Sequence, residues 1–311
     1  MSIPMKILVI RHGALGDFVK YVGHMQAIRA RYPGARITLL TQGFLVDFAR
    51  TLNCFDEILV DNRGYRISEW WHVVKRIIAD TGFDLIYDLQ SSNRTIWRYR
   101  LLAEFLTRHA MKWGRRMKSG GIDFYCTPSK PPFVFRMPKI EHFDFVPFPV
   151  DLSSCVAARD VIARLPERYV LLIPGCSATN LQKRWPADRY RAISERIASL
   201  YGLKTVVIGT RAEAKEAEKI CENREDAVNL IGVSSIADIA EIARRAVVTV
   251  GNDTGPTHIA RLSGARTVML FTAYDAARAA VSASHVVNLI GEKIEDIEVE
   301  AVLNAIRRLL S

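Results

Sequence analysis

Cysteine is scarce in this sequence, and the placement of the few cysteines excludes several classes of protein. Five cysteines are spread over 311 residues, with no CxxC pair and no histidine at metal-ligand spacing. An odd number of scattered cysteines is not the framework of a disulfide-stabilised domain, and seven scattered histidines do not indicate a structural zinc site. We therefore expect reduced cysteines with packing roles and no bound metal.

Long apolar runs, low-complexity tracts and repeats of fixed period are also absent. No apolar run reaches the roughly 18 residues of a membrane-spanning helix, and the first residues show no signal-peptide core. A hydrophobic fraction of 49% and a charged fraction of 24% are typical of globular enzymes. We expect a cytoplasmic protein, and its length predicts two domains.

Acidic residues are few in one part of the chain. Residues 1–151 carry 22 Lys and Arg against 14 Asp and Glu, whereas residues 152–311 carry 21 against 19. Between Arg94 and Lys118, eight basic residues occur with one acid. This segment favours an anionic partner, which is nucleic acid, anionic lipid or a phosphorylated substrate. A solvated helix face with excess charge is the alternative interpretation.

Strand-like and helix-like segments alternate along both halves of the chain. In the first half we expect strands at Lys6–Ile10, Arg36–Leu40, Glu57–Val60 and Asp84–Asp88, and helices near Phe18–Arg31, Leu45–Leu52, Glu69–Ala79 and Arg94–Arg108. In the second half we expect strands at Tyr169–Ile173, Lys204–Ile208, Val228–Leu230, Val247–Val250 and Thr267–Leu270, and helices near Ala157–Arg164, Ala187–Leu200, Ala212–Cys221, Ile236–Arg244, Pro256–Leu262 and Asp296–Leu310.

This alternation predicts an α/β fold of two Rossmann-like domains, residues 1–150 and 151–311, that face a cleft. Ligands of open α/β sheets bind beyond the C-terminal strand ends, so we expect the site in that cleft. The pattern is lost between Gly114 and Asp151, where six prolines crowd together. There we expect a mobile loop followed by an interdomain linker. The amphipathic final helix is a candidate for packing back on the first domain.

A strand followed at once by a helix start is the most informative feature. The apolar run Val247–Val250 leads into the octapeptide GNDTGPTH at 251–258, in which Pro256 suits the first helical turn. First-turn amides, with hydroxyls and a histidine nearby, suit a phosphate or diphosphate. In the alternative interpretation this is an ordinary turn in which Asp253 and Thr254 only cap the helix.

The first strand ends in a second motif, RHGALGD at 11–17. Its spacing is not GxGxxG, which disfavours a nicotinamide cofactor. Asp17 lies at the N-terminal edge of the next helix, where it suits a general base that takes a proton from an acceptor hydroxyl. Helix capping is the alternative role of Asp17.

A third motif follows the strand at Tyr169–Ile173. Ser177 and Thr179 offer hydroxyls, and Lys183 offers a point charge for a phosphate. Lys183 and its neighbour Arg184 can equally be solvated surface charges.

Three of these segments, in this order and spacing, resemble the ADP-heptose:lipopolysaccharide heptosyltransferases. They are GALGD at 13–17, KRWP at 183–186 and NDTGPTH at 252–258, and the resemblance covers nearly the whole chain. The family implies an inverting, metal-independent glycosyltransferase of GT-B architecture, without a cofactor, that moves heptose from ADP-heptose to the lipopolysaccharide inner core. It implies a nucleotide-sugar donor, an anionic glycolipid acceptor and peripheral contact with the cytoplasmic face of the inner membrane, and no nucleic acid.

The resemblance also assigns roles to single residues. It makes Asp17 the catalytic base. The residues on the donor side are Ser177, Thr179, Lys183, Asp253, Thr254, Gly255 and His258, with Gly209 and Thr210 bordering the nucleoside. The residues on the acceptor side are Gly13, Ala14, Gln90, Arg94, Arg115, Arg116 and Lys118. The chain departs from the family where an acid often follows the glycine at 209, because here Glu213 comes only after Thr210, Arg211 and Ala212.

Two other functions remain open. Fold alone does not set the substrate, so a GT-B transferase with another nucleotide sugar or acceptor is one alternative. A non-catalytic protein that binds nucleic acid or another anion through the basic segment is the other. Against it, no aromatic-interleaved nucleic-acid motif occurs, although Trp97, Tyr99 and Trp113 lie among the basic residues.

Overall fold

The computed structural model describes residues 4–62, 71, 75, 83–90, 112–116, 122–126, 139–143, 151–177, 180–280 and 282–311. The chain divides into two compact units, Met1–Val150 and Asp151–Ser311. The helix expected at Arg94–Arg108 lies outside the described residues, and so does the helix expected at Glu69–Ala79 apart from Trp71 and Lys75.

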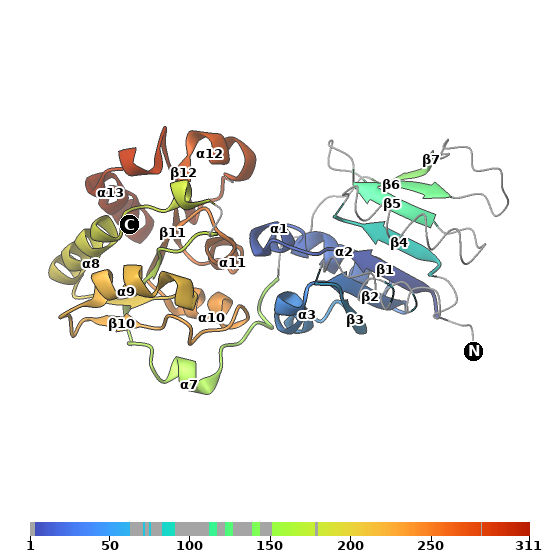
Figure 1. Ribbon diagram of the computed structural model, residues 1–311, viewed down its shortest axis with the longest axis horizontal. Helices are drawn as coiled ribbons and strands as arrows, with labels where there is room; N and C mark the ends of the chain where they lie inside the picture. The colour runs from blue at the N-terminus through green and yellow to red at the C-terminus, as the bar shows by residue number, and fades with distance from the viewer. Residues whose placement is uncertain are drawn as a thin grey trace. The chain divides into compact units, whose positions relative to one another are not determined.

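The described strands of the first unit form one sheet in the order β3-β2-β1-β4-β5-β6-β7 (Figure 1). Strands β1 to β5 are parallel, and β6 and β7 are antiparallel. The bounds of the strands are β1 Lys6–Ile10, β2 Arg36–Thr41, β3 Glu57–Val60, β4 Leu85–Asp88, β5 Lys112–Arg116, β6 Ile122–Cys126 and β7 Lys139–Phe143. The described helices are α1 Leu15–Val19, α2 Val22–Arg31, η1 Gly43–Leu45 and α3 Val46–Thr51.

The expectation of a loop and linker between Gly114 and Asp151 was wrong in part, because the region contains β6, β7 and the end of β5. Strand β5 pairs in parallel with β4, and β6 pairs antiparallel with β5. The pair Gly120-Gly121, which suggested a loop, separates β5 from β6 and is typical of a hairpin connection. In the sequence, all six prolines fall outside the residues of β5, β6 and β7, so none of them interrupts a described strand.

The second unit contains a six-stranded parallel sheet in the order β10-β9-β8-β11-β12-β13. When its strands are numbered from β8 as strand 1, this order is 3-2-1-4-5-6, which is the strand order of a dinucleotide-binding Rossmann sheet. The bounds of the strands are β8 Tyr169–Ile173, β9 Lys204–Val207, β10 Ala227–Asn229, β11 Val248–Asn252, β12 Thr267–Thr272 and β13 Val286–Gly291. Strand β13 was not expected from the sequence.

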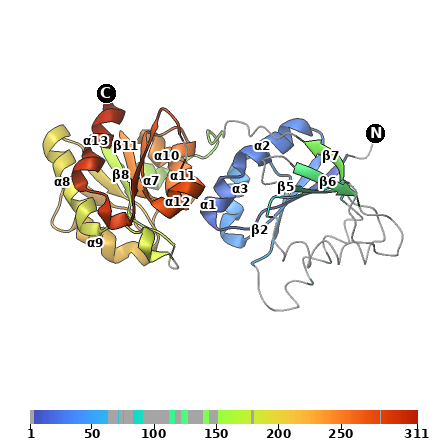
Figure 2. The ribbon, with the colours of Figure 1, turned by 90° about the horizontal axis from the view of Figure 1, so that it is seen from above.

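Helices cover both faces of this sheet, with α8, α9 and α13 on one face and α10, α11 and α12 on the other (Figure 2). The helix bounds are α7 Arg159–Ile162, α8 Ala187–Tyr201, α9 Ala214–Cys221, α10 Asp238–Arg245, α11 Gly255–Leu262, α12 Ala273–Ala279 and α13 Val299–Leu310, with short 3₁₀ turns η3 Leu181–Lys183, η4 Arg211–Glu213 and η5 Ile294–Asp296. Helix α12 was not expected from the sequence either.

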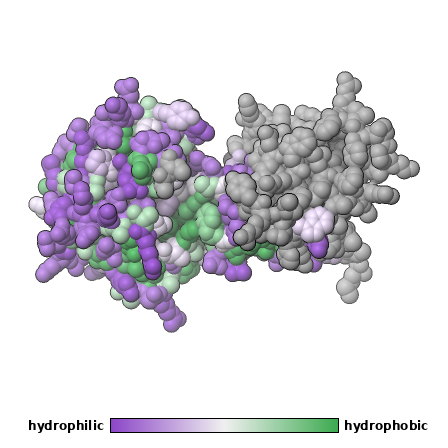
Figure 3. Space-filling view, viewed as in Figure 1, coloured by the Kyte–Doolittle hydropathy of each residue, from purple (hydrophilic) through white to green (hydrophobic). Residues whose placement is uncertain are grey.

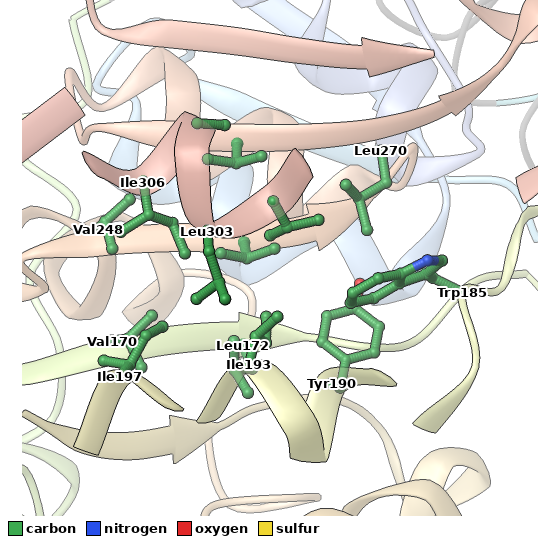
Figure 4. Packing of buried hydrophobic residues seen from close by; sticks show 14 of the residues in the cluster. Val170, Leu172, Trp185, Tyr190, Ile193, Ile197, Val248, Leu270, Leu303 and Ile306 are labelled. Carbon is green, nitrogen blue, oxygen red and sulfur yellow. The ribbon is translucent and has the colours of Figure 1, made fainter. Parts of the chain in front are cut away.

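The main core of the second unit lies between its sheet and helices α8, α9 and α13 (Figure 4). Alternate residues of β12 face opposite layers, since Val268 and Leu270 join this core while Met269 and Phe271 pack with α12. The buried residues of α13 belong to this core. The final helix therefore packs on the sheet of its own unit.

The surface of the second unit is mostly hydrophilic on the face shown in Figure 3. Within the described part of the chain, no helix combines the length and the apolar character that a membrane span requires.

Candidate functional site

Several of the predicted site residues that the structure describes lie where the strand order reverses in each sheet. In the second unit this point lies between β8 and β11, and the loops after these strands carry the segments 174–183 and 253–255. In the first unit it lies between β1 and β4; the segment Gly13–Asp17, which enters α1, follows β1, and Gln90 follows β4. Open α/β sheets bind their ligands at such switch points.

The start of α11 is packed closely against the sheet. A Cβ on Gly251 would lie 2.4 Å from Thr257 Oγ1 and 2.9 Å from Ile173 Cβ, so only glycine fits there. Thr254 is the N-cap of α11, and Pro256 occupies its first turn. The first-turn amides of a helix have no acceptor within the helix, and Pro256 has no N–H at all. The helix start therefore offers amide donors at the switch point.

Asn252 joins the two motifs of the second unit. Its side-chain nitrogen donates to Pro174 O at 2.8 Å and to Gly175 O at 3.2 Å. Its side-chain oxygen accepts from Trp185 N–H at 3.2 Å and from the Tyr190 hydroxyl at 3.0 Å. Because Asn252 is fully buried, it holds the KRWP segment against the end of β11. Sequence analysis found this residue only as part of the motif.

Lys183 lies inside a charged cluster. Its Nζ is 2.8 Å from Asp253 Oδ2 and 2.7 Å from Asp275 Oδ1, and its side chain is 19% exposed. Its neighbour Arg184 pairs with Glu216 and lies 3.7 Å from Glu213. Both basic residues are paired and partly buried, which excludes the interpretation that they are solvated surface charges.

His258 lies behind Asp253. Its Nε2 is 2.9 Å from Asp253 Oδ1, and its Nδ1 accepts a hydrogen bond of 3.0 Å from Arg261 Nε. The histidine is 1% exposed. Its ring therefore orients Asp253, and the chain Arg261–His258–Asp253–Lys183 runs from the interior of the unit to the switch point.

The ionisation of this cluster follows from its contacts. Burial would raise the pKa of Asp253, but hydrogen bonds from His258 and Lys183, together with the charge of the Lys183 ammonium, outweigh burial and lower that pKa to about 2. Burial would lower the pKa of Lys183, but Asp253 and Asp275 outweigh it and raise that pKa. The cluster thus holds a carboxylate and an ammonium at neutral pH.

Gly209 and Thr210 lie against a buried acid that sequence analysis did not place at the site. Glu213 Oε2 accepts from Thr210 N–H at 2.8 Å and from its hydroxyl at 2.7 Å. A Cβ on Gly175 or Gly209 would lie within 3.0 or 3.2 Å of the Glu213 side chain. The sequence signal was the Thr-x-x-Glu spacing of a capping box, which forms here at η4.

Of the two hydroxyl residues after β8, Ser177 is exposed and accepts a hydrogen bond from Asn180 Nδ2 at 3.2 Å. Thr179 lies outside the described residues. In the part of the chain that the structure describes, no three His, Cys, Asp or Glu side chains are grouped so that they could hold a metal ion.

Asp17 lies in the first turn of α1, and its side chain is 59% exposed. Lys20 Nζ approaches its Oδ1 at 4.0 Å. The preceding loop is held by Gln90, whose side-chain oxygen accepts from His12 N–H at 3.2 Å. A Cβ on Gly13 would lie 2.9 Å from Gln42 Oε1, so the loop packs closely against the chain after β2. Next to Gly13, Ala14 is the N-cap of α1.

Sheet register places part of the basic segment at the same edge of the first sheet. Ile10 pairs with Asp88, and Asp88 pairs with Arg115, in three neighbouring parallel strands. Arg115 and Arg116 therefore end β5 at the edge where β1 and β4 end. Arg94 and Lys118 lie outside the described residues.

Residues 141–302 match the sequence model of glycosyltransferase family 9 (heptosyltransferase). No curated protein sequence matches the chain. The solved structure of a family 9 glycosyl transferase from Veillonella parvula DSM 2008 is 18% identical, with 98% of this chain and 97% of that chain covered and a TM-score of 0.70.

Two solved structures from E. coli are also similar. The ADP-heptose LPS heptosyltransferase II is 17% identical over 98% of each chain, with a TM-score of 0.68. The heptosyltransferase WaaC with ADP-2-deoxy-2-fluoro heptose is 12% identical over 97% of this chain and 99% of that chain, with a TM-score of 0.67. The predicted fold class, two Rossmann-like α/β domains of GT-B architecture, is confirmed.

Proposed function

The chain belongs to glycosyltransferase family 9, the heptosyltransferase family, and we propose that it transfers heptose from ADP-heptose to an anionic acceptor of the lipopolysaccharide inner core. Family membership makes the chain a glycosyltransferase and bears out the resemblance. Two of the three motifs, KRWP and NDTGPTH, lie within the matched residues. The observation that supports the donor most directly is the cluster at the start of α11, where amide donors and the Lys183 ammonium lie together at a switch point.

The donor side supplies hydrogen-bond donors and one ammonium to the leaving group. In a direct displacement the anomeric C–O bond breaks, and its electron pair leaves on the diphosphate of ADP. Amides at the start of α11 and the Lys183 ammonium stabilise that charge where it develops. Thr254 and Gly255 bring the backbone close to the diphosphate, and Asp253 accepts hydrogen bonds from sugar hydroxyls. These amides and the ammonium are the groups that stabilise the diphosphate in this proposal, which includes no metal and no cofactor.

The acceptor side supplies the base. Asp17 is exposed at a helix start beyond β1, so an acceptor hydroxyl can reach its carboxylate. Its carboxylate takes the hydroxyl proton while the oxygen attacks the anomeric carbon from the face opposite the diphosphate, which inverts the configuration. Gly13 and Ala14 precede this carboxylate in the chain, and in this proposal their backbone lines the approach of the acceptor.

The basic segment accounts for the choice of acceptor. Arg115 and Arg116 end β5 at the edge that carries Asp17, and Arg94 and Lys118 belong to the same run of sequence. These side chains would bind phosphates or carboxylates of a glycolipid and meet anionic headgroups at the cytoplasmic face of the inner membrane. Contact of this kind is peripheral, and nucleic acid is not a partner in this account.

A donor panel tests the proposal. The purified protein, in EDTA, is supplied with a short inner-core acceptor and with ADP-heptose, ADP-glucose or UDP-sugars, and glycosylated product is measured by mass spectrometry. We expect turnover with ADP-heptose. Turnover with a UDP-sugar alone would replace the heptose donor with another nucleotide sugar.

A variant pair tests the base. Asp17→Asn should lower kcat by about 10²–10⁴-fold, because the hydroxyl loses its proton acceptor. Asp47→Asn is the matched control: Asp47 lies in the first turn of α3, is exposed, and pairs with Arg50 three residues later as Asp17 pairs with Lys20. Full activity of folded Asp17→Asn would remove this residue from the mechanism.

A further inference from the structure

Asp275 is a carboxylate of the donor-side cluster that neither the sequence motifs nor the resemblance assigns. It lies in the first turn of α12, after β12, and its Oδ1 is 2.7 Å from Lys183 Nζ. From the end of β11, Asp253 Oδ2 approaches the same nitrogen at 2.8 Å. The ammonium is therefore held between two carboxylates that come from different strand ends.

The orientation of Asp275 is itself fixed. The Thr272 hydroxyl donates to Asp275 Oδ2 at 2.6 Å and accepts from Asp275 N–H at 3.3 Å. Only 8% of Asp275 is exposed. Because one carboxylate oxygen is bound to Thr272, the other is directed at Lys183.

The second carboxylate changes what Lys183 can do. A lysine ammonium sits on a flexible four-carbon stem, and a single partner leaves much of that freedom. Asp253 is moreover shared with His258 through its other oxygen. With Asp275 in place, Nζ is fixed before the substrate arrives, and preorganised charge stabilises a transition state without the cost of reorganisation.

Capping of α12 alone does not explain the Asp275 carboxylate. The cap consists of the Thr272 hydroxyl and the backbone N–H of Asp275, and neither depends on the charge of the carboxylate. The charge of the carboxylate strengthens its hydrogen bond from Thr272 and favours the helix start, but its ion pair is with Lys183.

We propose that Asp275 is a positioning residue for glycosyl transfer, which holds the Lys183 ammonium beside Asp253, one residue before the N-cap of α11. What Lys183 binds follows from the proposed function, on which this proposal rests. The holding of Lys183 Nζ between the Asp253 and Asp275 carboxylates, which we call the clamp, is a property of the free protein. Groups facing Lys183 are Asp253 from the end of β11 and Asp275 from α12, with His258 and Arg261 of α11 behind Asp253.

The first test compares binding with turnover in Asp275→Asn. A flexible ammonium can still reach a bound diphosphate, and a repelling carboxylate has gone, so the ADP dissociation constant should stay within threefold or become tighter. The kcat with ADP-heptose should fall at least tenfold, because Lys183 is no longer held where charge develops. A residue that only supports the fold would weaken ADP binding and kcat together, and that result would overturn the proposal.

The second test measures Lys183 without activity. Amine-reactive labelling of the free protein across a pH series, quantified at Lys183 by mass spectrometry, gives the pH of half-labelling. Loss of one of two adjacent carboxylates should lower this midpoint by roughly one unit in Asp275→Asn. Thr272→Val keeps the carboxylate but loses its anchor, and it should shift the midpoint in the same direction by less.

Asp296→Asn is the matched control, since Asp296, like Asp275, is an acid in the first turn of a short helix of the second unit, and its carboxylate accepts from Lys293 N–H at 2.8 Å. Its midpoint at Lys183 should equal that of the wild type. An unmoved midpoint in Asp275→Asn, or an equal shift in Asp296→Asn, refutes the clamp. If the wild type binds no ADP while Asp275→Asn still shifts the midpoint, the proposed function fails and the clamp stands.

Discussion

Arg261 donates a hydrogen bond from Nε to His258 Nδ1 at 3.0 Å, and this contact determines the state of the imidazole. A guanidinium can only donate, so Nδ1 must be the unprotonated acceptor. The remaining ring proton then lies on Nε2, which donates to Asp253 Oδ1 at 2.9 Å. His258 is therefore neutral in this arrangement and acts on the donor site through Asp253, not as a cation against phosphate.

Nitrogen NMR of protein labelled with ¹⁵N-histidine tests this tautomer. At pH 7.5 the His258 Nδ1 resonance should have the shift of an unprotonated nitrogen and Nε2 that of a protonated one. The assignment uses His258→Gln, which removes the pair of signals. An imidazolium pattern, or protonation at Nδ1, would contradict the hydrogen-bond chain.

The lowered pKa of Asp253 predicts a pH-dependent contribution to stability. Its folded-state pKa of about 2 lies below the ordinary value of 3.8, so the contribution is present above pH 4 and is lost as pH falls toward 2. The Asp253→Asn variant lacks this contribution to stability. The difference in free energy of unfolding between wild type and variant should therefore shrink by about 1 kcal/mol from pH 6 to pH 3. Denaturant titrations at both pH values measure this difference, and a constant difference would contradict the ion pairing.

Gly251 should tolerate no side chain, because an added Cβ would meet Thr257 and Ile173 at 2.4 and 2.9 Å. We expect Gly251→Ala to destabilise the second unit by about 1–3 kcal/mol. Gly34→Ala is the control, since nothing lies within 4 Å of a Cβ there. Equal thermal stability of the two variants would show that the helix start is not packed as described.

The β11–α11 motif could be predicted from the sequence because its signals are local. A β-branched run, a polar turn and Pro256 specify strand, turn and helix within a dozen residues. The contacts that complete the site are not local. Asn252 joins segments 67 and 78 residues away in the chain, and such pairings depend on tertiary packing.

Asp275 and Thr272 were missed for a related reason. Helix α12 is short, and its alanine-rich sequence gives no clear apolar period. A local signal did exist in the spacing Thr272-x-x-Asp275, which resembles a capping box. In the first unit, β6 and β7 were missed because flanking glycines and prolines obscured two five-residue strands.

The most direct test of the central claim is calorimetric titration of the protein with ADP and with UDP, in EDTA, repeated on Lys183→Gln and on His258→Ala. The account predicts metal-free binding of ADP, weaker binding of UDP, and at least tenfold loss of ADP affinity in Lys183→Gln, with a smaller loss in His258→Ala. Absence of ADP binding, or ADP binding that is unchanged in folded Lys183→Gln, would contradict the assignment of the β8–β11 switch point as the donor site.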